Sequence, residues 1–195
     1  SLGTLALGSG NVTTSAGTAD VSALEWSGGS LNGKVKASSA TFSGDAKTIG
    51  SAGELTLSGV TNSIGGGAIT NQGKFIKNST GTTDITAAFD SAGTLTSDAG
   101  ILKLSGGGKS SNAINISSGA KLQVATNNYT FENATLNGAG ELDLTGAKTT
   151  FRNTTSNAKV SVNGGNLDFD GTLSTLGTLA VASGSVTITS GLADV

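Results

Sequence analysis

A short motif recurs along the second half of the chain about every 20 residues. It combines a small first residue with Leu or Val at the third position and an apolar residue at the fifth. Its third positions are Leu102, Leu122, Leu142, Val160 and Leu179, and its fifth positions are Leu104, Val124, Leu144, Val162 and Val181. Self-similarity at a fixed period is typical of repeat architectures, in which each repeat buries its apolar face by stacking on its neighbours.

Further rows of apolar residues keep nearly the same interval. Phe131, Phe151, Phe169 and Ile188 follow one another with this spacing. A second row comprises Leu55, Phe75, Leu95, Ile116 and Leu136, and it resumes with Leu173 and Leu192. A third row comprises Ile49, Ile69 and Phe89. Near the start of the chain, Leu5 and Leu7 precede Leu24 and Trp26 by one such interval. Several independent rows at one period predict stacked coils whose core is built from these residues.

Local patterns indicate that the coils are made of strands. Residues 185–189 read Ser-Val-Thr-Ile-Thr, which has the period of a strand with one buried face. The 31 glycines and many β-branched residues disfavour long helices, and Pro, which would interrupt a coil-to-coil ladder, is absent. We therefore predict an all-β, right-handed parallel β-helix (β-solenoid) of about 18–21 residues per coil and roughly ten coils, about 45–50 Å long.

The alternative all-β fold is an up-and-down barrel or a sandwich. It predicts hairpin turns between adjacent strands and gives no reason for residues one interval apart to match in type. A right-handed solenoid is favoured because left-handed ones keep strict six-residue sides, whereas the intervals here vary. We expect residues 1–195 to form a single solenoid segment. Because the chain starts at Ser1 without Met and both ends lie in strand-like repeats, we expect a fragment of a longer or processed protein.

The composition excludes several kinds of chemistry. The chain has no His and no Cys, which excludes Ser–His and Cys–His catalysis, His–metal sites, zinc thiolates and disulfides. Eleven Lys and Arg stand against 13 Asp and Glu without a basic cluster, so no nucleic-acid partner is expected. Apolar runs are far shorter than the roughly 20 residues that span a bilayer, so no membrane insertion is expected. No cofactor is expected.

Residues 24–33 read Leu-Glu-Trp-Ser-Gly-Gly-Ser-Leu-Asn-Gly. This segment resembles the Trp-Ser/Thr-Gly-Gly-x-Leu-x-Gly element of repeat regions in very large bacterial surface proteins, and residues 57–73 continue the same style. The wider pattern is similar to autotransporter passengers and to filamentous-haemagglutinin-type adhesins. The resemblance implies an extracellular right-handed β-helix at the bacterial cell surface, acting as a stalk, an adhesin or a matrix fibre.

Acidic residues supply the best case for an enzyme. Asp143 and Asp168 hold the same position in Gly-x-Leu-Asp-Leu/Phe, with Glu141 and Asp170 as same-face neighbours. Paired carboxylates about 5–9.5 Å apart can hydrolyse glycosides, and several that converge with carbonyls can bind Ca²⁺. The separation of Asp143 and Asp168 in the sequence does not match the coil period, so we expect the two motifs on different sides of the coil. The competing interpretation is that they are exposed, solubilising residues.

Two other sets of polar side chains could carry function. Lys103, Lys121 and Lys159 occupy equivalent outward positions of the motif, and we expect charge alternation with residues such as Glu141 to give weak cross-strand pairs. Trp26 and Tyr129 are the aromatic residues that carry a hydrogen-bonding group, an indole N–H and a phenol O–H. We expect core packing for Trp26, with stacking on a sugar ring as the alternative.

These observations predict a non-enzymatic structural or adhesive segment of a bacterial extracellular surface or matrix protein, forming a stiff rod, stalk or filament. The expected partners are adjoining coils of the same or neighbouring chains, including end-to-end self-assembly, together with host or matrix glycans. The alternative is a carbohydrate-binding or carbohydrate-processing β-helix, such as a phage tailspike-like module. It requires a groove lined by converging acids and aromatic side chains.

Overall fold

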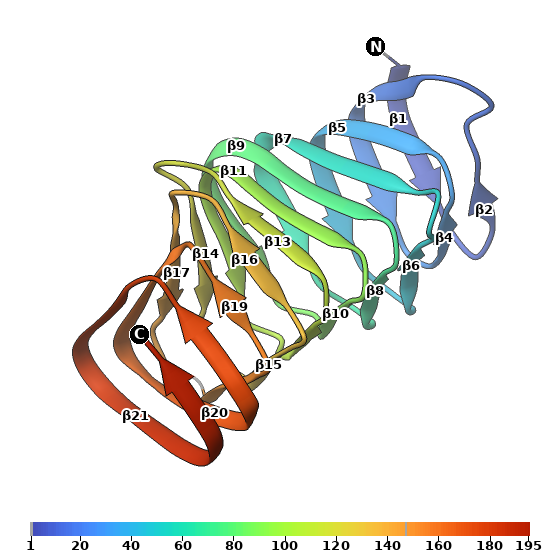
Figure 1. Cartoon of the computed structure of the whole chain (residues 1–195). Helices are drawn as coiled ribbons and strands as arrows, with labels where there is room; N and C mark the ends of the chain where they lie inside the picture. The colour runs from blue at the N-terminus through green and yellow to red at the C-terminus, as the bar shows by residue number, and fades with distance from the viewer. Residues whose placement is uncertain (1, 147) are drawn as a thin grey trace.

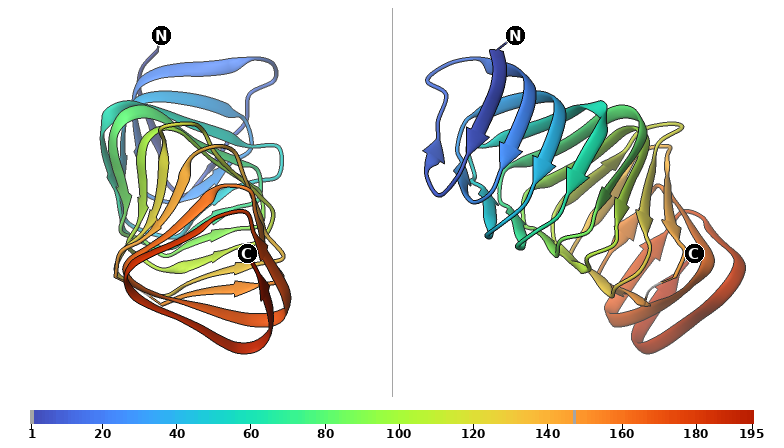
Figure 2. Two further views of the ribbon diagram at one scale, coloured as in Figure 1. Left: turned by 60° about the vertical axis from the view of Figure 1, so that its left-hand side comes forward. Right: turned by 180° about the vertical axis from the view of Figure 1, so that it is seen from behind.

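The computed structural model describes residues 2–146 and 148–195. In this part of the chain, 21 strands join through parallel pairings into one continuous sheet. Figure 1 shows the coils stacked along one axis, with the two termini at opposite ends, and Figure 2 shows that the coils close around a shared interior. The protein is a parallel β-solenoid of about ten coils with roughly 20 residues per coil, as predicted. Its right-handed sense stays a prediction.

Short strands end at sharp corners, whereas long strands continue through a corner, where the register of their pairing with the next coil shifts. The first eleven are β1 (Leu2–Leu7), β2 (Asn11–Val12), β3 (Thr18–Trp26), β4 (Gly29–Leu31), β5 (Lys34–Phe42), β6 (Lys47–Ile49), β7 (Glu54–Ile64), β8 (Ile69–Asn71), β9 (Lys74–Ile85), β10 (Phe89–Ser91) and β11 (Thr94–Leu104). The other ten are β12 (Gly108–Ser110), β13 (Ala113–Ile116), β14 (Lys121–Val124), β15 (Tyr129–Glu132), β16 (Thr135–Asn137), β17 (Glu141–Leu144), β18 (Lys148–Arg152), β19 (Thr155–Ser156), β20 (Lys159–Leu176) and β21 (Leu179–Asp194).

The coil has three faces, which we name A, B and C after their rows of inward-facing residues. The row of face A is Leu7, Trp26, Phe42, Ile64, Ile85, Leu104, Val124, Leu144, Val162 and Val181. The row of face B is Val12, Leu31, Ile49, Asn71, Ser91, Ser110, Phe131, Phe151, Phe169 and Ile188. The row of face C is Ala19, Val35, Leu55, Phe75, Leu95, Ile114, Leu136, Ser156 and Leu176. Each row is an axial column of stacked side chains.

The rows predicted from the motif stand in register. Successive pairs join Leu102, Leu122, Leu142, Val160 and Leu179; Leu104, Val124, Leu144, Val162 and Val181; and Phe131, Phe151, Phe169 and Ile188. Nearly all of these side chains are buried, but Val181 and Ile188 are 52% and 58% exposed, so the expectation that they lie in the core is wrong. No coil among the described residues follows β21 to cover them.

The row predicted to run through Leu95, Ile116 and Leu136 is displaced by two positions at Ile116. Ile114, rather than Ile116, pairs with Leu95 and with Leu136. Both isoleucines are buried and lie on the same side of β13, because inward positions recur at every second position along a strand. Spacing alone therefore cannot choose between them.

Two further predictions from spacing need the same kind of correction. Ile69 pairs with Lys47, whereas Ile49 pairs two positions further along, so Ile49 and Ile69 belong to different rows. Leu173 and Leu192 pair with each other, but they are 48% and 69% exposed and lie outside the core. An apolar residue at the right interval is thus insufficient to establish an inward position.

Coil length varies more than the spacing of the motif predicts. Trp26 pairs with Phe42, and Phe42 pairs with Ile64, so a coil shorter than the motif interval is followed by one that is longer. The additional residues are taken up after Ala37, where the register between β5 and β7 shifts. The corners therefore absorb differences in length while the inward rows stay aligned.

A stack of aromatic rings fills part of face B. The ring centroids of Tyr129 and Phe131 are 5.1 Å apart, those of Phe131 and Phe151 are 5.4 Å apart, and those of Phe151 and Phe169 are 5.9 Å apart. The two Phe–Phe pairs meet edge to face at 86°, a geometry that contributes about 0.5–1.5 kcal/mol beyond the burial of apolar area. This stack ties consecutive coils together.

Small and amide-bearing residues make the corners. A Cβ atom added at Gly73 would lie 2.1 Å from the carbonyl oxygen of Gly53, which accepts the Lys74 N–H at 2.9 Å. Any side chain at Gly73 would therefore push apart a coil-to-coil hydrogen bond. Asn133 and Asn153 adopt left-handed φ values of 51° and 50°, which asparagine tolerates better than most residues, and Nδ2 of Asn153 donates to Oδ1 of Asn133 at 3.3 Å.

Candidate functional site

Carboxylates gather on the outer sides of two faces. Glu141 and Asp143 lie on β17 on the outside of face A, and Asp168 and Asp170 lie on β20 on the outside of face B. Asp143 belongs to the pairing of β17 with β20, whereas Asp168 belongs to the pairing of β18 with β20. The two motifs therefore occupy different faces, as the sequence predicts.

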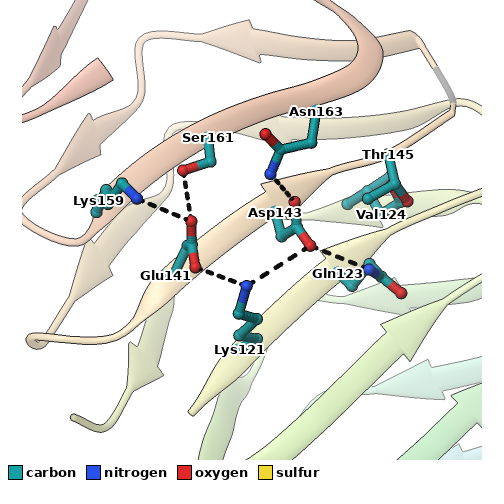
Figure 3. Close-up of polar contacts among 9 residues, drawn as sticks. All are labelled: Lys121, Gln123, Val124, Glu141, Asp143, Thr145, Lys159, Ser161 and Asn163. Carbon is teal, nitrogen blue, oxygen red and sulfur yellow. Dashed lines mark hydrogen bonds and ion pairs between the residues drawn. The ribbon is translucent and has the colours of Figure 1, made fainter. Parts of the chain in front are cut away.

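Glu141 lies between cations of the coils before and after its own (Figure 3). Lys121 Nζ is 2.8 Å from Oε2, Lys159 Nζ donates to Oε1 at 3.1 Å, and the Ser161 hydroxyl also donates to Oε1. The hydrogen bond from Lys121, followed by the one from Ser161, lowers the pKa of Glu141 to about 2. Both carboxylate oxygens are thus engaged by neighbouring coils, and the group is ionised at neutral pH.

Asp143 is engaged by the same two neighbouring coils. Gln123 Nε2 donates to Oδ2 at 3.0 Å and Asn163 Nδ2 donates to Oδ1 at 2.7 Å, while Lys121 Nζ lies 4.0 Å from Oδ2. Only 5% of Asp143 is exposed. Figure 3 shows the amides on opposite sides of the carboxylate, which therefore joins its own coil to both neighbours.

Asp168 makes equivalent contacts on face B. Lys148 Nζ lies 2.8 Å from Oδ2, and the hydroxyls of Thr187 and Thr189 donate to Oδ1 at 3.1 and 2.6 Å. The hydrogen bond from Lys148, with those from the two threonines, lowers the pKa of Asp168 despite its burial.

Asp170 completes the set. Arg152 donates to Oδ2 through Nε at 3.0 Å and through Nη2 at 2.7 Å, and the Ser190 hydroxyl donates to Oδ1 at 2.7 Å. The hydrogen bond from Ser190, followed by the one from Arg152, lowers the pKa of Asp170. As on face A, an acid in one coil is held by the coils on either side.

These contacts disfavour general-acid catalysis by Glu141, Asp168 and Asp170. A glycosidase general acid must hold a proton at its working pH, which requires a raised pKa. The pKa values of Glu141, Asp168 and Asp170 are all lowered. Among residues 2–146 and 148–195, no group of three or more His, Cys, Asp or Glu side chains is arranged to hold a metal ion. The arrangement is suited to joining coils.

Alternating charges form a short row on every face. The rows are Lys34, Glu54 and Lys74 on face C, Lys121, Glu141 and Lys159 on face A, and Glu132, Arg152 and Asp170 on face B. Exposed pairs of this kind contribute about 0.2–1 kcal/mol each. Their larger effect is on register, because a shift by one position would turn the charges toward the core.

Lys103 does not share the position of the other two lysines of the motif. Lys121 pairs with Ile101, whereas Lys103 pairs with Gln123, two positions further along the strand. Lys103 instead lies 2.8 Å from Oδ2 of Asp84 in the preceding coil. The predicted alternation with Glu141 is present, but it involves Lys121 and Lys159.

The contacts of Glu141 predict a specific dependence of stability on pH. Its pKa is about 2 in the folded protein and near 4.5 without these contacts. Between these values the unfolded chain binds a proton that the folded protein does not, so the free energy of unfolding falls as the pH falls from about 4.5 to about 2. Urea unfolding of the Glu141→Gln variant is expected to show a shallower decline over this interval. Partial exposure of Lys121 and Lys159 limits the size of the effect.

Glu25→Gln, at an exposed position on β3, is the matched control for the loss of one negative charge. Its decline is expected to follow that of the unmodified protein. Parallel curves for Glu141→Gln and the unmodified protein would contradict the assigned ion pairs.

The aromatic side chains are all part of the core. Trp26 and Tyr129 are each 1% exposed, and every Phe is buried, which confirms core packing for Trp26. The Tyr129 hydroxyl pairs with Ser110 Oγ at 2.7 Å. A surface hollow of about 370 Å³ borders Trp26, but Glu25 is the single carboxylate among its lining residues. No aromatic ring among the described residues is exposed, and this hollow does not bring two acids together, whereas the carbohydrate-processing alternative requires a groove with both.

The interior contains polar residues that the sequence analysis did not single out. Asn71, Ser91 and Ser110 interrupt the apolar row of face B, and Asn71 Nδ2 donates to Ser91 Oγ at 2.9 Å. The signal that could have revealed them is their spacing. They lie between Ile49 and Phe131 in the sequence, and each is separated from the next member of the row by about the length of one coil. Asn71 Nδ2 also donates to the carbonyl oxygen of Thr94 at 3.0 Å, and Ser91 Oγ donates to that of Gly93 at 3.1 Å.

Lys77 is a buried cation of this interior. It pairs with Leu57 before it and Ser97 after it and is 0% exposed. Its Nζ donates to the carbonyl oxygens of Ser79, Gly81 and Ala99, and burial lowers its pKa. The alternation of inward and outward residues along a strand could have indicated an inward Lys77, because it follows the inward-facing Phe75 by two positions.

No helix in the described part of the chain is long and apolar enough to cross a membrane. Comparison with protein-family models, with curated proteins and with solved structures finds no significant match to this chain.

Proposed function

We propose that this chain is a non-enzymatic structural or adhesive segment of a bacterial extracellular surface or matrix protein, serving as a stiff rod or stalk. The observation that carries the proposal is the alignment of inward rows through the stacked coils. Backbone hydrogen bonds between coils run along the rod axis, and the stacked side chains resist sliding of one coil past the next.

The outer surface supports the same function. Glu141, Asp168 and Asp170 bind cations and hydroxyls of adjoining coils, and these contacts join each coil to its neighbours. The two termini lie at opposite ends of the stack, as a spacer requires. The placement outside a bacterial cell rests on the resemblance of residues 24–33 to repeats of surface proteins.

Single-molecule stretching tests the mechanical part of the proposal. The chain has no cysteine, so a cysteine added at each end gives unambiguous attachment points. Because each coil contacts chiefly its neighbours, we expect stepwise unfolding with increments of one coil, about 20 residues or about 65–70 Å of contour length. With one attachment moved to Ser118→Cys, at an exposed corner, fewer coils remain under force and the number of steps falls accordingly. One step that releases the whole chain would contradict the proposal.

Two further measurements address location and ligands. Antibodies against the chain are expected to label intact bacterial cells or their matrix, and labelling that requires permeabilised cells would contradict the surface location. A reducing-sugar assay is expected to show no turnover, whereas binding on a glycan array would assign the rod an adhesive role. Turnover would instead favour a carbohydrate-processing β-helix.

A further inference from the structure

Lys77 places a charge at an inward position that carries no charge in the adjoining coils. The equivalent residues are Leu57 in the coil before it and Ser97 in the coil after it, and all three side chains are buried. Among residues 2–146 and 148–195, no carboxylate forms an ion pair with Lys77. A buried charge is costly unless hydrogen bonds compensate for the lost water, so the groups around the ammonium must provide them.

Backbone carbonyl groups provide these hydrogen bonds. Nζ of Lys77 donates to the carbonyl oxygens of Ser79, Gly81 and Ala99, one for each of the three N–H groups of an ammonium. Ser79 and Gly81 lie on β9, whereas Ala99 lies on β11 in the next coil, where the register of the pairing shifts on both sides of Ala99. Carbonyl oxygens of two coils therefore converge on one cation at an irregular corner.

The corner fits closely around this cation. A Cβ atom added at Gly100 would lie 2.5 Å from Nζ of Lys77 and nearer still to the carbonyl oxygen of Gly81. Gly81, Ala99 and Gly100 are partly exposed, whereas Lys77 is not, so the cation lies just beneath the surface of the corner. Oγ of Ser79, whose carbonyl group is one of the three acceptors, is buried without a hydrogen-bond partner. The site is thus a shallow, oxygen-lined space of the size of one small cation.

We propose that this corner is a binding site for one monovalent cation, which the chain fills with the ammonium of Lys77. A chain without that ammonium takes up a free ammonium or potassium ion in its place. The three acceptor oxygens belong to uncharged groups, whereas proteins commonly hold divalent cations with carboxylates, so the site suits a single positive charge. Because the cation is part of the chain, the corner of the unmodified protein keeps its geometry whatever ions surround it. The inference concerns one corner and is independent of the proposed function as a rod.

Truncation of the lysine followed by addition of free cations tests the site. Lys77→Ala removes the ammonium and opens the space that its side chain fills, so this variant is expected to melt below the unmodified protein. Ammonium or potassium chloride should raise its melting temperature saturably, by at least about 2–4 °C over tetramethylammonium chloride at equal ionic strength. Tetramethylammonium has no N–H group and is too large to enter. The unmodified protein should melt equally in all three salts.

Lys77→Met is the matched control, because it also lacks the charge but its longer side chain still fills the space. It is expected to melt equally in the three salts, as the unmodified protein does. Equal melting temperatures of Lys77→Ala in the three salts, or a response that Lys77→Met shares, would overturn the proposal. A larger rise with calcium chloride would overturn the assignment to a monovalent cation.

A measurement on the unmodified protein decides the matter if Lys77→Ala does not fold. Because Nζ of Lys77 is buried and hydrogen-bonded, its hydrogens should exchange slowly with water, and NMR of the lysine ammonium groups should show a protected signal that Lys77→Met lacks. Lys74→Met, which removes an exposed lysine of the same strand, should retain that signal. The absence of a protected signal from Lys77 would overturn the occupied cation site. Stepwise unfolding under force is a separate readout, so the rod and the cation site fail separately.

Discussion

Replacing Phe131 with Asp is expected to unfold the coils around β15. Phe131 is fully buried and its ring contacts those of Tyr129 and Phe151 at 5.1 and 5.4 Å. Truncating a buried Phe to Ala costs about 3–5 kcal/mol, and Asp adds the cost of an unpaired charge in an apolar interior. The total is comparable with the whole stability of a typical domain, about 5–15 kcal/mol. Circular dichroism and thermal melting should show the loss.

Thr130→Asp is the matched control for this prediction. Thr130 is the neighbouring residue on β15, points outward and pairs with Lys109 of the preceding coil. An Asp at this position faces solvent near a cation, so a change within about 0.5 kcal/mol is expected. Equal melting curves for Phe131→Asp and Thr130→Asp would show that the inward register of face B is wrong.

Replacing Lys77 with Met is expected to have the second-largest effect. Met retains much of the apolar length of the side chain but donates no hydrogen bond to the carbonyl oxygens of Ser79, Gly81 and Ala99. A buried acceptor without a partner costs about 1–3 kcal/mol. Because the removal of the buried charge offsets part of this cost, we expect a loss of about 2–5 kcal/mol, measured by urea unfolding.

Lys74→Met supplies a control on the same strand. Lys74 is largely exposed and lies 3.6 Å from Oε2 of Glu54 in a surface ion pair, which contributes about 0–1 kcal/mol. A loss at Lys77 no greater than that at Lys74 would mean that water or a rearranged corner satisfies the three carbonyl groups.

The periodic part of the fold can be predicted from the sequence. The rows through Leu102, Leu104 and Phe131 follow from a nearly constant interval, because one apolar side chain per coil must meet its equivalent in the next coil. The choice between Ile114 and Ile116 cannot be made this way, since both satisfy the alternation of a strand.

The positions of the polar residues inside the fold are harder to predict from the sequence. Lys is almost never fully buried without a partner, so its residue type favours a surface position for Lys77, although strand alternation after Phe75 points inward. Its partners are carbonyl groups at a corner, and backbone geometry there cannot be inferred from residue types. The partners of Glu141 are partly predictable, because Lys121 and Lys159 flank it at the coil interval, but Ser161 and the amides around Asp143 are revealed by the three-dimensional register.

The tolerance of the corners to changes in length has a consequence for how such a chain can diversify. The short coil from Trp26 to Phe42 and the long coil from Phe42 to Ile64 leave their shared inward row aligned. Insertions at a corner can therefore accumulate without changing the stacked inward rows, since surface loops accept added residues at small entropic cost. A recognition loop could be gained or exchanged on one coil while the remaining coils keep their geometry, which separates the evolution of binding from the evolution of the scaffold.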